Sequence, residues 1–77
     1  SAVKVGSYYF DVDYTDIFFE EDAMVLYNES ECQIFTTEGV EKYRGNFGKS
    51  VRLMLPAGGS YKYYLVTDNT IDTIQLK

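Results

Sequence analysis

Residues 25–34 read Val25-Leu26-Tyr27-Asn28-Glu29-Ser30-Glu31-Cys32-Gln33-Ile34, and residues 65–74 read Leu65-Val66-Thr67-Asp68-Asn69-Thr70-Ile71-Asp72-Thr73-Ile74. Each segment has an apolar run, then Asn or Asp with Ser or Thr two residues later, then a second run with Ile at the same place. Asn, Asp and Ser favour turns, whereas β-branched and aromatic residues favour strands. Each segment therefore predicts a β-hairpin.

The pattern extends outward over the whole chain and predicts an all-β, antiparallel fold. Runs rich in Tyr, Phe, Val, Ile and Thr alternate with turn residues, and helical periodicity is hard to find. We expect a single small domain over residues 1–77, with half-repeats at 1–41 and 42–77 and about eight short strands in two small sheets. The expected strands are 4–12, 16–19, 23–28, 32–36, 41–47, 51–55, 61–67 and 70–76.

The two hairpins are 40 residues apart in the sequence. A period near 40 with about four strands per unit is the spacing of a β-propeller blade, although two hairpins can also be alike by chance. The side chains expected in the core lie on strand positions bracketed by polar or turn residues. They are Phe10, Phe19, Leu26, Ile34, Phe47, Leu53, Leu65 and Ile74.

The residue types that are missing exclude several classes of function. The chain has no His and one Cys, so it cannot build a Ser-His-Asp triad, a Cys-His pair, an internal disulfide or a thiolate zinc site. Its net charge of −5 argues against nucleic acid as a partner. No apolar run reaches the roughly 18 residues of a membrane span, so we expect no membrane insertion by this segment. We expect no enzymatic activity and no cofactor.

Acidic residues before the second expected strand are a candidate cation site. Asp11, Asp13 and Asp16 would meet near a strand end, and calcium prefers several oxygen ligands from one loop. The segment lacks the glycine and the downstream glutamate of an EF-hand loop. A solvated acidic loop is the alternative to a calcium site here.

Paired tyrosines are the candidate ligand-binding residues. Tyr8 and Tyr9, and likewise Tyr63 and Tyr64, are consecutive strand residues, so one of each pair must point away from the core. Exposed tyrosines bind glycans or other proteins, because they offer a large contact area at a small entropy cost. Alternatively, the rings support the sheets or fill a core.

Charge is divided unevenly along the chain. Residues 1–41 contain ten acidic residues and one basic residue, a net charge of −9, whereas residues 42–77 have a net charge of +4. Such halves attract each other, either within one molecule or head-to-tail between copies. The chain also has long apolar terminal strands, and exposed edges invite pairing. We therefore expect a homo-oligomer, held by strand edges more than by charge.

One family resemblance follows from these elements. The two turns, together with Gly39–Tyr43, Val51–Pro56 and Thr70–Lys77, resemble the C-terminal part of an uncharacterised bacterial family. Members of that family are membrane-anchored and carry propeller-like β-repeats outside the cell. The resemblance covers residues 15–77 and carries over no functional residue. It implies an extracellular or cell-surface location and a binding or scaffold role.

Three kinds of function are compatible with the sequence. The first is a non-catalytic binding or scaffold module of a bacterial surface protein, with a protein or a glycan as partner. The second is a carbohydrate-binding module that uses exposed tyrosines. The third is a fragment of an enzyme that works with paired carboxylates, which can hydrolyse a glycoside without His. The chain starts at Ser1 rather than Met, so we expect it to be part of a longer protein.

Overall fold

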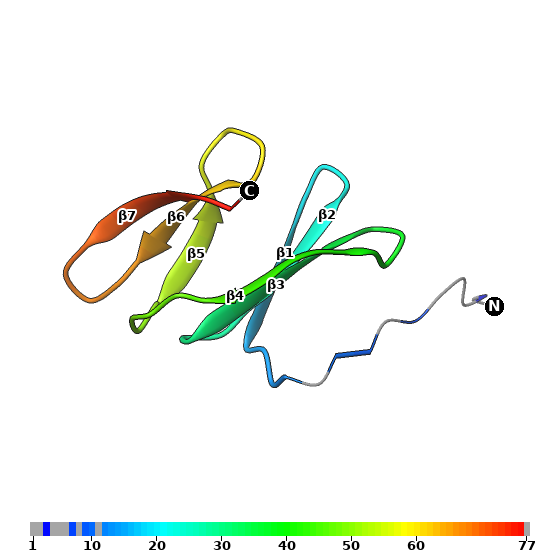
Figure 1. Ribbon diagram of the computed structural model, residues 1–77, viewed down its shortest axis with the longest axis horizontal. Coiled ribbons are helices and arrows are strands. Elements are labelled where there is room, and N and C mark those ends of the chain that lie inside the picture. Colours follow the sequence, from blue (N-terminus) through cyan, green and yellow to red (C-terminus); the bar gives the residue numbers. More distant parts are fainter. Residues whose placement is uncertain (1–2, 4–6, 8, 11, 77) are drawn as a thin grey trace.

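The structure is a computed structural model, and it describes residues 3, 7, 9, 10 and 12–76. Within these residues the chain forms seven antiparallel strands and no helix (Figure 1). The first sheet has the order β1-β2-β3-β4, and the second has the order β5-β6-β7. The all-β, antiparallel prediction in two small sheets is confirmed. The strands are β1 (Asp16–Glu20), β2 (Ala23–Tyr27), β3 (Glu31–Thr36), β4 (Glu41–Asn46), β5 (Leu53–Pro56), β6 (Lys62–Val66) and β7 (Ile71–Gln75).

Seven of the eight expected strands lie within two residues of their predicted bounds. The remaining one, 4–12, falls partly on residues 4–6, 8 and 11, which lie outside the described residues. Its described residues do not belong to a strand. β4 pairs with β3, so the first sheet ends at Asn46, a few residues beyond the boundary of the half-repeats.

The β2–β3 turn is held by one side chain. The Asn28 Oδ1 atom accepts hydrogen bonds from the backbone N–H groups of Ser30, at 2.8 Å, and Glu31, at 2.9 Å. The Asn28 N–H donates in turn to the Glu31 carbonyl at 3.0 Å. This is the local bonding that makes Asn a turn residue, and it closes the hairpin at the Tyr27–Cys32 pair.

The β6–β7 turn has the same sequence pattern but different bonds. The Thr67 hydroxyl oxygen accepts the Thr70 N–H at 3.0 Å, and the Thr67 N–H donates to the Thr70 carbonyl at 2.9 Å. Asp68, at the position of Asn28, instead accepts two hydrogen bonds from Arg52, at 2.8 and 3.3 Å. These bonds and the charge of the guanidinium lower the pKa of the exposed Asp68 carboxyl.

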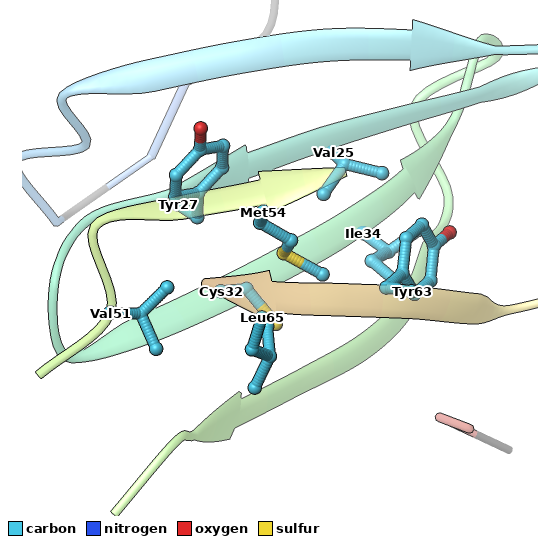
Figure 2. Close-up of a cluster of buried hydrophobic side chains, with 8 residues drawn as sticks. All are labelled: Val25, Tyr27, Cys32, Ile34, Val51, Met54, Tyr63 and Leu65. Atoms are coloured by element: carbon cyan, nitrogen blue, oxygen red, sulfur yellow. The ribbon is translucent and has the colours of Figure 1, made fainter. Parts of the chain in front are cut away.

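The core lies between the two sheets (Figure 2). The Phe18 ring packs against Tyr27 and Tyr63, with ring centroids 6.2 and 6.1 Å apart, and so joins β1 to both sheets. The buried core residues come from both sheets and the segment between them. They are Val25, Tyr27, Cys32, Ile34, Val51, Met54, Tyr63 and Leu65.

The expected core is correct in part. Ile34 and Leu65 lie in the core, and Phe47 and Ile74 are partly buried against it. Leu26 is buried, but it lies outside the cluster between the sheets.

Phe10, Phe19 and Leu53 do not lie in the core: they are 48%, 64% and 41% exposed. The physical reason is strand alternation, since Phe18 and Met54 take the inward positions next to Phe19 and Leu53. Phe10 precedes β1 and belongs to no strand.

Candidate functional site

The outer side of the first sheet, facing away from the core, is apolar along β1 and β2. Val25 and Tyr27 point into the core, so the alternate residues Met24 and Leu26 lie on the outer side. The sheet register places Ile17 opposite Leu26 and Phe19 opposite Met24. These side chains line a groove of about 400 Å³ together with Phe10 and Thr37. Met24 and Leu26 form the buried floor of this groove, and Ile17 and Phe19 are more than half exposed beside it.

Polar contacts border this groove and hold the segment before β1 in place. The Tyr14 hydroxyl donates to Gln33 Oε1 at 2.9 Å, and the Gln33 amide donates to the Glu41 carboxylate. Gln33 is 5% exposed and lies opposite Leu26 on the same side of the sheet. Phe10 packs edge-on against Tyr14, with ring centroids 6.0 Å apart. Phe10, which packs against Tyr14, therefore forms one wall of the groove.

The outer side of the second sheet is apolar as well. Met54, Tyr63 and Leu65 point into the core, so the alternate positions face outward. Cross-strand pairing aligns Leu53 with Val66 and Ile71, and Leu55 with Tyr64 and Thr73. Four of the outward side chains are exposed to a large degree: Leu53 and Leu55 at 41%, Tyr64 at 39% and Ile71 at 70%.

The four candidate tyrosines do not share one surface. Tyr63 is 1% exposed, and burial, followed by the Glu20 charge, raises the pKa of its hydroxyl to about 12. Tyr64 lies on the outer side of the second sheet, as alternation requires. Tyr9 is 89% exposed in the segment before β1, and Tyr8 lies outside the described residues. Tyr64 and Tyr9 are therefore the described candidates whose rings reach solvent.

Two of the candidate calcium ligands lie near each other. Asp13 and Asp16 border a polar hollow of about 450 Å³ that Glu29 and Arg52 also line. The Thr15 hydroxyl donates to Asp16 Oδ2 at 3.2 Å, and the Asp13 carbonyl accepts from the Asn28 amide at 3.2 Å. Asp11 lies outside the described residues. Across the residues that are described, no three His, Cys, Asp or Glu side chains are grouped so that they could hold a metal ion.

Cys32 is deeply buried. It is 1% exposed and lies in the core between the sheets. Burial, and then the neighbouring Glu31 charge, raises the pKa of its thiol to about 12. The thiolate is the reactive form, so this side chain is a poor nucleophile near neutral pH.

The two outer apolar faces are functional candidates that the sequence reasoning missed. Their signal was present in Ala23–Tyr27, which reads Ala-Met-Val-Leu-Tyr without polar interruption. A continuous apolar strand indicates burial on both sides of a sheet, whereas alternation indicates one buried side. The residues described include no helix with the length and hydropathy that crossing a bilayer requires.

Comparison with known proteins connects the chain to a family. The sequence matches a family of unknown function (DUF5711) over residues 1–76. No curated protein and no solved structure matches it. The match extends over nearly the whole chain and agrees with the resemblance to an uncharacterised family. The chain therefore belongs to the family of unknown function DUF5711.

Proposed function

We propose that the chain is a non-catalytic protein-binding or scaffold module. The observation that carries this proposal is the pair of outer sheet faces, which stay apolar and open although the core between the sheets is closed. Soluble proteins seldom leave contiguous apolar surface open unless it serves an interaction. Ile17 and Phe19 on the first sheet and Ile71 on the second are each more than half exposed.

The proposal extends to a propeller-like arrangement in a membrane-anchored protein at a bacterial cell surface. The extracellular location and the anchor are supported by the family resemblance alone. Sheets stacked as blades need apolar side chains on both sides, and both sheets here have them.

The carbohydrate alternative has less support from the positions of the tyrosines. Tyr63 lies in the core, and Tyr64 is surrounded on its face by Leu55 and Thr73 across the strands. The enzyme alternative also has less support. The carboxylates of Asp13 and Asp16 border a polar hollow, whereas the catalytic acid of a glycosidase needs apolar surroundings that raise its pKa.

Site-specific photo-cross-linking tests the proposed function. A photoreactive phenylalanine would replace Phe19, Ile71 or, as a control, Val40, which is 54% exposed in the β3–β4 turn. We expect adducts with protein at positions 19 and 71 and none at position 40. The proposal fails if neither face gives a protein adduct. It also fails if the chain binds a glycan and the single substitution Tyr64→Ala abolishes that binding.

A further inference from the structure

We propose that the outer face of the first sheet binds the outer face of the second sheet of another copy of this chain, head-to-tail. The inference rests on the proposed function, because it names the partner of the same two faces. For the first sheet, the face comprises Ile17, Phe19, Met24 and Leu26, with Phe10 at its border. For the second sheet, it comprises Leu53, Leu55, Tyr64 and Ile71.

The two faces have complementary shapes. The first is a groove whose floor, Met24 and Leu26, is buried at 7% and 3% exposure. On the second face, the four apolar side chains are 39% to 70% exposed. Packed sheets interdigitate such side chains at a spacing of about 10 Å. The protruding residues of the second sheet therefore have a place to insert on the first.

Charge favours this pairing over pairing between two first-sheet faces. Glu31 and Glu41 lie on the outer side of the first sheet, where Glu41 contacts Gln33 and Glu31 alternates with the inward Cys32. Lys62 alternates with the inward Tyr63 and so lies on the outer side of the second sheet. Arg44 also lies on the outer side of the first sheet, because it pairs with the outward Gln33. With Lys42 and Arg44 in β4, residues 16–46 of the first sheet have a net charge of −6, whereas residues 47–76 have a net charge of +1. Two first-sheet faces would bring like charges together, whereas a first-sheet face meets opposite charge on the second sheet.

The geometry has a consequence for the size of the assembly. A head-to-tail contact uses a different surface on each copy, so it leaves one free face at each end of a dimer. Association therefore continues beyond two copies, either into a ring or into an open chain. A contact between identical faces would stop at the dimer.

Two single-face variants test the inference by sedimentation velocity over a range of protein concentrations. Phe19→Lys places a cation on the first-sheet face, where it would be buried against the apolar second-sheet face of a partner. Ile71→Glu places an anion on the second-sheet face, where it would meet the acidic first sheet of a partner. Both positions are exposed, at 64% and 70%, and circular dichroism would verify folding. Val40→Lys is the matched control in a turn outside both faces.

We expect each variant alone to associate at least about tenfold more weakly than the wild type, because a charge would be buried without a partner. An equimolar mixture would form a heterodimer, since each variant keeps the face that the other lacks. The mixture would form nothing larger, and Val40→Lys would behave as the wild type.

Three results would overturn the inference. One is a wild type that stays monomeric at high micromolar concentration. Another is a dimer formed by one variant alone, which would indicate pairing between identical faces. The third is a mixture that stays monomeric. If photo-cross-linking at positions 19 and 71 gives adducts with another protein and not with a second copy of this chain, the proposed function would stand while this inference fails.

Discussion

At the scale of single residues, the direction of each side chain decides its role in this protein. Neighbouring strand residues point to opposite sides, so a shift of one position exchanges core and surface. Phe18 packs on Tyr63 in the core, whereas Phe19 is 64% exposed. The local sequence could not distinguish these two, because they are adjacent Phe residues in the apolar run 17–19. In Ala23–Tyr27 both sides of the strand are apolar, so the sequence predicts burial there without giving the direction of each side chain.

A pair of truncations measures this difference. Ile34→Ala should lower the free energy of unfolding by about 2–5 kcal/mol, because it leaves a cavity at a fully buried position. Phe19→Ala should lower it by less than about 1 kcal/mol, because most of that ring is already in water. Urea denaturation of dilute samples provides both values. Equal losses would show that β1 faces the other way.

The buried Cys32 predicts a dependence of stability on alkaline pH. Its pKa is raised from 9.0 to about 12 in the folded chain, so the unfolded chain loses its proton first. The stabilisation is complete below about pH 9 and is lost as the pH rises toward 12, by at most about 1.4 kcal/mol per pH unit. Tyr63, whose pKa is also raised to about 12, adds a loss that starts near pH 10.

Denaturation between pH 8 and 11 would measure this effect in the wild type and in Cys32→Ala. The variant should show a shallower fall in the free energy of unfolding over this range. A thiol reagent at pH 8 should label the folded wild type far more slowly than the denatured chain. Equal pH slopes, or equally fast labelling, would contradict the buried, protonated thiol.

At the scale of elements, seven of the eight strands expected from the sequence are present, and turn residues with local hydrogen bonds lie at their ends. The turn at Asn28 can be predicted from the local sequence, because the Asn28 side chain accepts hydrogen bonds from two nearby backbone N–H groups. The turn at Asp68 is held by different hydrogen bonds: Thr67 is the acceptor of the backbone N–H, and the Asp68 carboxylate pairs with Arg52. The side chain of Arg52 is distant in sequence, so this bond could not be foreseen from the turn motif. Likewise, the sequence shows where β4 lies but not which sheet it joins.

The Asn28 turn can be tested by two substitutions at one position. Asn28→Ala should lower the free energy of unfolding by about 1–2 kcal/mol, because it removes an acceptor that serves two N–H groups. Asn28→Asp keeps an acceptor oxygen at the same place and should cost less than half as much. Thermal and urea denaturation measure both. An Asp variant as destabilised as the Ala variant would show that the acceptor does not hold this turn.

At the scale of the whole molecule, the structure is two sheets with one closed interface and two open apolar faces. Acidic residues predominate in the first sheet, where residues 16–46 have a net charge of −6, and this favours the head-to-tail order proposed for the two faces. The continuous apolar strand Ala23–Tyr27 indicated apolar residues on both sides of the first sheet, but the sequence could not show which side of each sheet meets the other. Of the candidate tyrosines, Tyr64 belongs to one of these faces, and Tyr63 belongs to the core.

Methyl NMR spectra recorded over a dilution series test the central claim, that the outer faces are the binding surfaces. The methyl groups to compare are those of the outer side chains Ile17, Met24, Leu26, Leu53, Leu55 and Ile71 and those of the inner side chains Val25, Ile34, Met54 and Leu65. The account predicts that the outer methyl resonances of both sheets shift together as concentration rises, while the inner ones stay in place. Outer methyl groups that remain unchanged, while the backbone amides of the edge strands β1, β4, β5 or β7 shift, would contradict it in favour of pairing through strand edges.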